Sequence, residues 1–434
     1  MTKTVQTSET RLRAVTIALA IAIMLVPAVV AARAQAQTYK ETVLHSFSYN
    51  GTDGDIPLAG LIRDAAGNLY GTTVTGGTGN CDYYPFWGCG TVFKVTKTGQ
   101  ETVLYSFTGP PDGQYPDASV VRDAKGNLYG TTPYGGSDAC YDGYEYGCGV
   151  VYKVDTTGKE TVLYTFTGTG GDGGYPRAAL VLGPNGTLYG TTYYGGSGAC
   201  NDGVGLGCGT VFRLVPNGKE TVLHSFTGTG GDGSYPQAEL LGDPKGDLYG
   251  TTEYGGDPTC GNDDSGCGTV FKLDNAGKET VLYTFTWGGD GDYPLAGLVR
   301  DAEGNLYGTT AGGGANFWGT VFKLDKGNNE TVLYSFCSQG SCADGASPFG
   351  GVVRDKEGNL YGTTFRGGAS GDGTVFKLSR TGNETVLHSF TGSADGGDGS
   401  NPVASLVRDA KGNLYGITQY GGTNNYGTVF ELTP

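Results

Sequence analysis

The decapeptide D-A-K-G-N-L-Y-G-T-T at residues 123–132 decides the fold, because its core recurs along the chain. The string L-Y-G occurs seven times and begins at Leu69, Leu128, Leu188, Leu248, Leu306, Leu360 and Leu414. E-T-V-L also occurs seven times, from Glu41, Glu101, Glu160, Glu220, Glu279, Glu330 and Glu384. G-T-V-F, once written G-V-V-Y, begins at Gly90, Gly149, Gly209, Gly268, Gly319, Gly373 and Gly427. The chain is therefore a tandem repeat of seven units, each 54 to 60 residues long.

Each unit has the composition of four short strands rich in Val, Thr, Tyr, Phe and Leu, separated by Gly, Asp, Asn and Pro. In the second copy we expect strands at 118–122, 127–132, 150–154 and 160–166. Short turns join the first strand to the second and the third to the fourth, which predicts two hairpins. Seven four-stranded antiparallel units without helical periodicity predict an all-β, seven-bladed β-propeller. A β-solenoid is the alternative, although its coils are usually shorter.

The two ends of the repeat array predict how the ring closes. The array opens at residues 41–47 on a fourth strand with no third strand before it. It stops at residues 427–432 on a third strand with no fourth after it. We therefore expect 41–47 to pair with 427–432 and complete the seventh blade.

The repeat resembles a known family. Its pattern of D-x-x-G-N-L-Y-G-T-T, G-G, G-T-V-F-K-L and E-T-V-L-Y-S-F is similar to the GloVer tandem repeat of exported bacterial proteins, named from Gloeobacter and Verrucomicrobia. The D-x-x-G-N-L-Y start is also similar to the NHL propeller repeat, although G-T-T replaces that repeat's usual acidic continuation. The resemblance implies an exported protein and establishes no biochemical activity.

The N-terminus is typical of a secretory signal peptide at residues 1–36. Lys3, Arg11 and Arg13 precede an almost wholly apolar run at 14–32, and small residues follow at a cleavage-like site. An uncleaved membrane anchor is the alternative. We expect residues 37–434 to form a single propeller domain, secreted to the extracellular space or periplasm.

Charge excludes one class of partner. The net charge of -15 becomes -18 once the four cations and one anion of residues 1–36 are removed. Phosphate contacts need clustered Lys and Arg, so the sequence argues against nucleic acid, and a membrane is expected as a partner only if the signal segment stays attached. We expect a monomer without a cofactor or metal.

All ten cysteines lie in the long connections between strands. Their even number and close spacing in an exported chain predict five local disulfides. Metal binding is the alternative, but the spacing is poor for zinc and His is scarce. The expected pairs are Cys81 with Cys89, Cys140 with Cys148, Cys200 with Cys208, Cys260 with Cys267, and Cys337 with Cys342.

Aromatic residues break the symmetry of these same connections. Flat rings on stiff loops can stack on a sugar or a partner protein, or they can cover the blade tops. The candidate ligand-binding residues are Tyr83, Tyr84, Phe86, Trp87, Tyr141, Tyr144, Tyr146, Trp287, Phe317 and Trp318.

One aspartate recurs in the motif D-G-x-x-P before each first strand. Seven such acids could ring the channel and hold a cation, but the adjacent glycine favours a turn in which each Asp binds its own backbone. They are Asp53, Asp112, Asp172, Asp232, Asp290, Asp344 and Asp398.

Catalytic signals are weak. His45, His224 and His388 occupy a strand position that is Tyr in the other copies, and neither G-x-S-x-G nor H-E-x-x-H is present. The sequence favours a secreted, non-enzymatic module that binds a glycan or a surface protein. The alternative is an extracellular polysaccharide hydrolase or lyase that uses carboxylates of the long loops.

Overall fold

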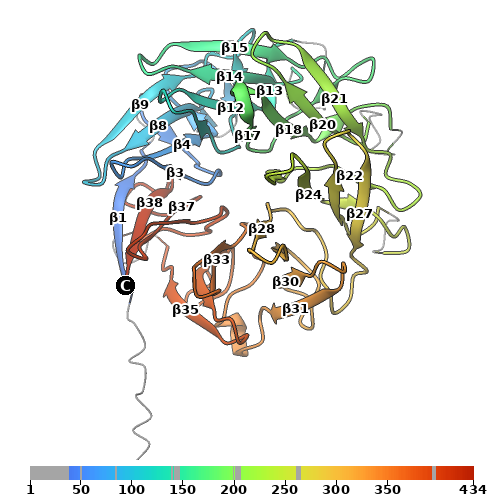
Figure 1. Ribbon diagram of the computed structural model, residues 1–434. Helices are drawn as coiled ribbons and strands as arrows, with labels where there is room; N and C mark the ends of the chain where they lie inside the picture. Colours follow the sequence, from blue (N-terminus) through green and yellow to red (C-terminus); the bar gives the residue numbers. More distant parts are fainter. Residues whose placement is uncertain are drawn as a thin grey trace, which may run out of the picture. The chain divides into compact units, whose positions relative to one another are not determined.

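The computed structural model describes residues 39–434 except 49–50, 84–85, 138–139, 141–146, 199, 201–206, 261–264 and 393–396. Residues Tyr39–Pro434 form one compact unit. Seven four-stranded antiparallel sheets, the blades, follow one another around a ring in chain order (Figure 1). The all-β, seven-bladed propeller is thus confirmed. The expected signal peptide lies outside the described residues, within which no helix is long and apolar enough to cross a membrane.

Each blade orders its strands from the centre of the ring to its rim. The first strands are β3 (Ile62–Arg63), β11 (Val121–Arg122), β17 (Val181–Leu182), β23 (Leu241–Gly242), β28 (Val299–Arg300), β32 (Val353–Arg354) and β36 (Val407–Arg408). The second strands are β4 (Leu69–Thr73), β12 (Leu128–Thr132), β18 (Leu188–Thr192), β24 (Leu248–Thr252), β29 (Leu306–Thr310), β33 (Leu360–Thr364) and β37 (Leu414–Thr418). The third strands are β8 (Thr91–Val95), β14 (Val150–Val154), β20 (Thr210–Leu214), β26 (Thr269–Leu273), β30 (Thr320–Leu324), β34 (Thr374–Leu378) and β38 (Thr428–Thr433). The fourth strands are β9 (Glu101–Ser106), β15 (Glu160–Thr165), β21 (Glu220–Ser225), β27 (Glu279–Thr284), β31 (Glu330–Ser335), β35 (Glu384–Ser389) and β1 (Lys40–Ser46).

Two-residue strands add small ladders among the long connections. They pair β2 (Gly54–Asp55) with β5 (Thr75–Gly76), β10 (Gly113–Gln114) with β13 (Tyr134–Gly135), β16 (Gly173–Gly174) with β19 (Tyr194–Gly195), β22 (Gly233–Ser234) with β25 (Tyr254–Gly255), and β6 (Asp82–Tyr83) with β7 (Phe86–Trp87). Single 3₁₀ turns lie at Pro184–Gly186 and Gly340–Cys342.

The ring closes as the repeat ends predict. β1 pairs antiparallel with β38, from Lys40 opposite Thr433 to Ser46 opposite Thr428. The blue first strand therefore lies beside the red last strand in Figure 1. Because the first and last repeats share one sheet, β38 is paired on both sides and the seventh blade has four strands like the others.

The glycine of each L-Y-G is required by a close approach inside the blade. A Cβ atom added to Gly308 would lie 2.6 Å from the Phe322 ring, and one added to Gly71 would lie 2.7 Å from Phe93. The same relation holds at Gly190, Gly250, Gly362 and Gly416. Glycine in the second strand thus lets the aromatic side chain of the third strand lie flat across the sheet.

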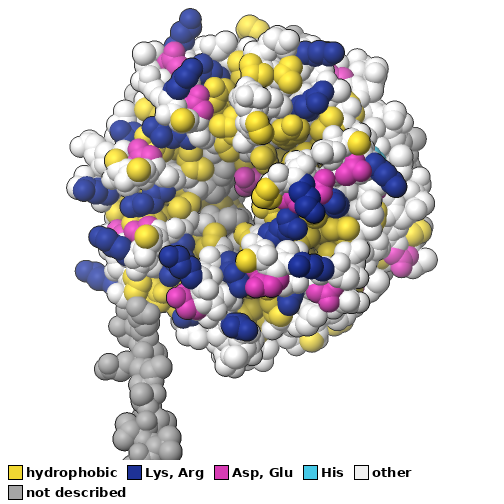
Figure 2. Space-filling view, in the orientation of Figure 1, with side chains coloured by type: hydrophobic (Ala, Val, Ile, Leu, Met, Phe, Trp, Pro, Cys, Tyr) yellow, Lys and Arg dark blue, Asp and Glu magenta, His cyan; other side chains and the backbone are white. Residues whose placement is uncertain are grey.

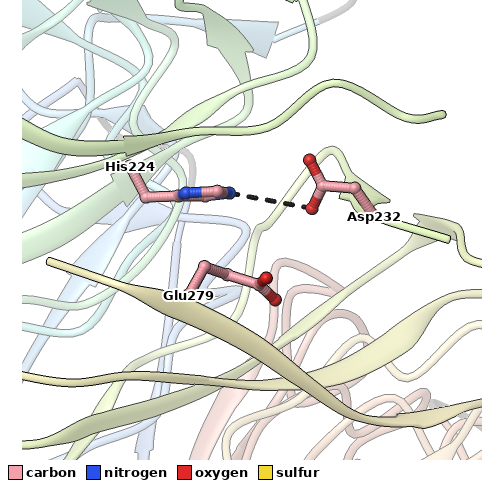
Figure 3. Close-up of side chains that lie close together, drawn as sticks. All are labelled: His224, Asp232 and Glu279. Carbon is pink, nitrogen blue, oxygen red and sulfur yellow. Dashed lines mark ion pairs between the residues drawn. The ribbon is translucent and has the colours of Figure 1, made fainter. Parts of the chain in front are cut away.

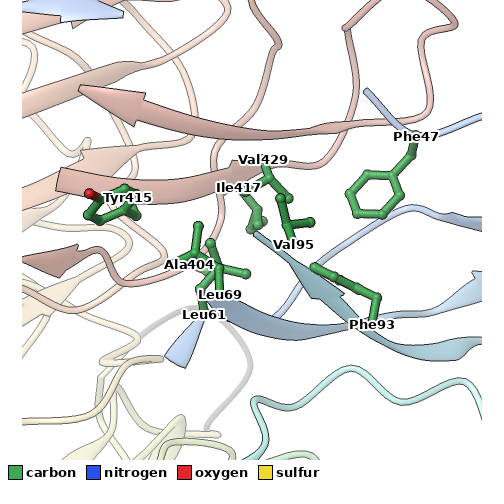
Figure 4. Packing of buried hydrophobic residues seen from close by; sticks show 9 residues of the cluster. All are labelled: Phe47, Leu61, Leu69, Phe93, Val95, Ala404, Tyr415, Ile417 and Val429. Carbon is green, nitrogen blue, oxygen red and sulfur yellow. The ribbon is translucent and has the colours of Figure 1, made fainter. Parts of the chain in front are cut away.

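A chain of aromatic contacts links each blade to the next. The last residue of each E-T-V-L-x-x-F string is a fully buried phenylalanine whose ring meets, edge-on, the third-strand aromatic of the following blade. Phe47 lies 5.2 Å from Phe93, and Phe390 lies 5.2 Å from Phe430, between ring centroids. Figure 4 shows Phe47 and Phe93 beside Val95 and Val429 at the closing joint. The hydrophobic core is therefore distributed over seven joints between blades.

The first strands are shorter than the sequence predicts. We expected residues 118–122 to be extended and paired, but the ladder of β11 contains only Val121 and Arg122. The carbonyl of Ala118 instead accepts a hydrogen bond from Thr72 Oγ1 of the preceding blade, at 3.0 Å. The backbone near the axis therefore joins neighbouring blades.

Candidate functional site: the loop face and the central channel

The two ends of the ring differ in their connections. The tight turns of both hairpins lie at one end, which we call the hairpin face, and both long connections of each blade lie at the other, the loop face. Lys and Arg are concentrated in and beside the hairpins, for example Lys125 and Lys159. Figure 2 shows cationic side chains around a central hollow. The loop face therefore carries few cationic side chains.

Five disulfides clamp the loop face, and the pairs are those expected from the sequence. Cys89, Cys148, Cys208 and Cys267 have no exposed surface and pack into the hydrophobic clusters between blades. Each of these four bridges therefore ties a long loop directly to the core. Disulfides of this kind persist in oxidising compartments.

Four of the candidate aromatic residues are exposed. Among the described residues, the exposed large hydrophobic side chains are Trp87, Trp287, Phe317 and Trp318, with exposed fractions of 53%, 44%, 63% and 38%. All four belong to long connections and hence to the loop face. Tyr83 and Phe86 lie on β6 and β7, but their side chains are outside the description. Tyr84, Tyr141, Tyr144 and Tyr146 lie outside the described residues.

Three of these residues gather on one blade, and we call Trp287, Phe317 and Trp318 the blade-5 patch. The rings of Trp287 and Phe317 lie 6.4 Å apart between centroids, tilted by 54°. Their loops are tied by a hydrogen bond from the Gly314 amide to the Gly288 carbonyl, at 2.8 Å. Both Trp287 and Phe317 have left-handed backbone conformations, with φ of 51° and 64°. Bulky residues rarely adopt this region, so the loops hold the two rings outward at a conformational cost.

The seven aspartates of D-G-x-x-P bind their own loops. Asp112 accepts hydrogen bonds from the amides of Thr108 and Gly113 at 3.0 and 2.7 Å, and from the Tyr105 hydroxyl at 2.8 Å. Each of the other six likewise accepts an amide hydrogen bond from the loop that follows its outer strand. None of the seven lines the central channel. Their contacts are those of a capped turn at the outer strand.

A second acidic residue faces each of these turns from the next blade. It is the glutamate that begins each E-T-V-L strand, and its Oε1 is buried without a hydrogen-bond partner among the described residues. Burial raises the pKa of six of these glutamates to about 7, and raises that of Glu279 as well. In Figure 3, Glu279 points toward the ion pair of His224 with Asp232, whose Nε2 and Oδ1 lie 3.7 Å apart. One potential ligand atom from each of these three residues lies within 4.8 Å of the others. The position of His224 is occupied by Tyr in four blades. The feature that recurs in all seven copies is therefore a contact between the glutamate of one blade and the aspartate turn of its neighbour.

The central channel is a cavity of about 450 Å³ lined by the first segments of all seven blades. The residue after the repeated proline of each blade contributes to its wall. Around the ring these residues are Leu58, Asp117, Arg177, Gln237, Leu295, Phe349 and Val403. At this position the wall is thus polar in blades 2 to 4 and apolar in the other four blades. The change from polar to apolar residues after the proline is present in the sequence, but it lies outside the long loops from which the candidate residues were chosen.

The long-loop carboxylates that the enzymatic alternative would use include Asp142, Glu145, Asp202, Asp263 and Asp264, which lie outside the described residues, as does the side chain of Asp82.

These features define a disulfide-clamped, seven-bladed propeller with a patterned channel. The chain belongs to the Gloeobacter/Verrucomicrobia repeat family, whose model matches residues 29–262, 139–300 and 259–434. Comparison with curated proteins gave no match.

Comparison with solved structures found similar chains at low sequence identity. A gluconolactonase from Xanthomonas campestris is 12% identical, with a TM-score of 0.42, and the match covers 91% of this chain and 89% of that one. A puromycin-hydrolysing peptidase from Mycobacterium tuberculosis is 14% identical, with a TM-score of 0.50, and the match covers 89% of this chain and 54% of that one. Similarity at this level extends to the fold alone.

Proposed function

We propose that this protein is a secreted, monomeric, non-enzymatic module whose loop face binds a glycan. The observation that carries the proposal is the blade-5 patch, where Trp287 and Phe317 hold exposed rings 6.4 Å apart on loops that are hydrogen-bonded to each other. Aromatic faces stack on the apolar faces of sugar rings, and fixed loops reduce the ordering cost of binding.

Two further observations support this proposal. The five disulfides suit an oxidising compartment, in agreement with export of the mature chain. N-terminal sequencing of the exported protein should give a start near residue 37. The mature chain is acidic, which favours neutral or hydroxyl-rich ligands over polyphosphates.

The test is retention of the mature protein in affinity electrophoresis gels that contain neutral or acidic polysaccharides. Truncation of a central aromatic contact costs about 2 kcal/mol, or about 30-fold in affinity. We therefore expect Trp287→Ala and Phe317→Ala to lose most of the retention, while Trp287→Phe retains much of it because a flat ring remains. Unchanged retention of both folded alanine variants would remove the patch from the binding site.

The same panel separates binding from hydrolysis. Release of reducing ends or unsaturated products from a retained polysaccharide would establish the alternative, an enzyme. Retention without turnover would support the module.

A further inference from the structure

The polar wall of the channel contains buried groups whose hydrogen-bonding capacity is unused. Asp117 Oδ1 and Arg177 Nε have no partner among the described residues, although both atoms are buried. Asp117 and Arg177 attract each other, but no ion pair within 4.0 Å joins them in the described part of the chain. Burial outweighs this attraction and raises the pKa of Asp117 to about 7. A charged pair held apart in this way is costly unless a third group bridges it.

The guanidinium of Arg177 is held in place from two sides. It lies over the ring of Tyr193, with Cζ 5.1 Å from the ring centroid, and it also interacts with Tyr134. Tyr193 is itself fixed, because its hydroxyl donates to Glu253 Oε2 at 2.9 Å and Gln237 donates to the same oxygen at 2.8 Å. This arrangement orients the cation before any ligand arrives.

Glu239 adds a second carboxyl group to the polar side. It lines the channel, and its side chain is exposed to that space while protein surrounds it elsewhere. The protein around it raises its pKa. Its carboxyl oxygens can accept hydrogen bonds from hydroxyl groups.

The opposite side of the channel offers no polar side chains at the matching positions. Leu58, Leu295 and Val403 line it together with Phe349, whose ring stacks on Phe365 at 4.8 Å. A ligand that fits must therefore have one polar edge, one apolar face and an anionic group for Arg177.

We propose that the channel binds a hexuronate, as a free sugar or the end residue of a chain, with its carboxylate on Arg177, its hydroxyls on Asp117 and Glu239, and its C–H face against the apolar wall. A planar guanidinium suits a carboxylate in particular, because it can donate two parallel hydrogen bonds. A cavity of about 450 Å³ is within the range of small-ligand sites. The site is separate from the blade-5 patch and does not rest on the function proposed for it.

Isothermal titration of the mature protein with glucuronate and galacturonate tests the assignment, with glucose and galactose as uncharged counterparts and glycine as a small zwitterion. We expect the uronates to bind about ten- to a hundredfold more tightly than the neutral sugars, as loss of a charge-assisted contact implies. Equal binding of uronate and neutral sugar, absence of uronate binding, or tighter binding of glycine would overturn the proposal.

Variants test the residues. Arg177→Gln should reduce uronate affinity at least about tenfold, whereas Arg366→Gln, which removes an arginine outside the channel wall, should leave it unchanged. If Arg177→Gln does not fold, Asp117→Asn preserves shape and should weaken both uronates and hexoses through the shared hydroxyl contact. Unchanged uronate binding in a folded Arg177→Gln or Asp117→Asn protein refutes the assignment. Trp287→Ala should leave channel binding intact, which separates this proposal from the preceding one.

Discussion

The glutamates between blades make the stability of the ring depend on pH, and Glu330 shows how. It is the first residue of β31, and its Oε1 is buried without a hydrogen-bond partner among the described residues. Burial and, secondarily, the negative charge of Asp290 raise its pKa from 4.5 to about 7. Glu330→Gln keeps the shape of the side chain and removes its charge. The variant therefore isolates how much ionisation of the Glu330 carboxyl group lowers the free energy of unfolding.

The sign follows from proton binding. Between about pH 4.5 and 7 the folded ring keeps a proton that the unfolded chain has released, so the free energy of unfolding falls as pH rises through this window and levels off above it. The full difference in pKa corresponds to about 3.4 kcal/mol. The carboxyl group is only partly shielded from solvent, and screening reduces the expected contribution to about 1–2 kcal/mol. Glu330→Gln should therefore stabilise the protein by about 1–2 kcal/mol at alkaline pH and by little in acid.

Denaturant unfolding of the mature protein, followed by tryptophan fluorescence at several pH values from about 5 to about 8, measures this effect. The wild-type protein should be more stable at the acidic end, and Glu330→Gln should flatten part of the slope. Glu303→Gln, an exposed acid in a hairpin of the same blade, is the matched control and should leave the slope unchanged. A wild-type stability that rises from pH 5 to 7, or an identical slope in Glu330→Gln, would refute the reasoning.

Two substitutions probe the packing of the ring, both measured by thermal and denaturant unfolding. Phe47→Ala removes a fully buried ring at the closing joint and should cost about 3–5 kcal/mol, and a loss below about 1 kcal/mol would mean that closure contributes little. Gly308→Ala places a methyl group 2.6 Å from an aromatic ring and should cost about 1–3 kcal/mol. Gly289→Ala, where nothing lies within 4 Å, is its control and should change stability by less than about 0.5 kcal/mol.

Local repetition made the fold predictable. L-Y-G and G-T-V-F mark the second and third strands because their composition suits sheets, and repetition supplies the blade count. The pairing of residues 41–47 with residues 427–432 followed from counting strands at the two ends. The length of the first strand did not, because Ala118 bonds to a threonine of another blade. That contact depends on how blades converge at the axis, which strand propensity does not describe.

The candidate site was less accessible to sequence reasoning. The spacing of the cysteines identified the disulfides. The exposed Trp287 was identified because most of the other repeats lack an aromatic residue at its position, which is evident from the sequence alone. The joint of Glu279 with His224 was overlooked, because its members lie in different repeats and meet only when the ring forms. Asp117 and Arg177 were also overlooked. Both follow a repeated proline, where four other repeats have an apolar residue. Only the folded ring shows that this position lines the central channel.

Sequence differences between the repeats are limited at positions whose side chains contact a neighbouring strand or blade. The second-strand glycines, the buried phenylalanines and the glutamates at the joints each contact a neighbouring strand or blade, so a change in one copy disturbs a shared interface. Residues after the repeated proline line the channel, and the exposed aromatic residues of the long loops face solvent. Charges and exposed aromatics can therefore differ there from one repeat to the next, and a ligand in the channel would use the free hydrogen-bonding capacity of Arg177 Nε.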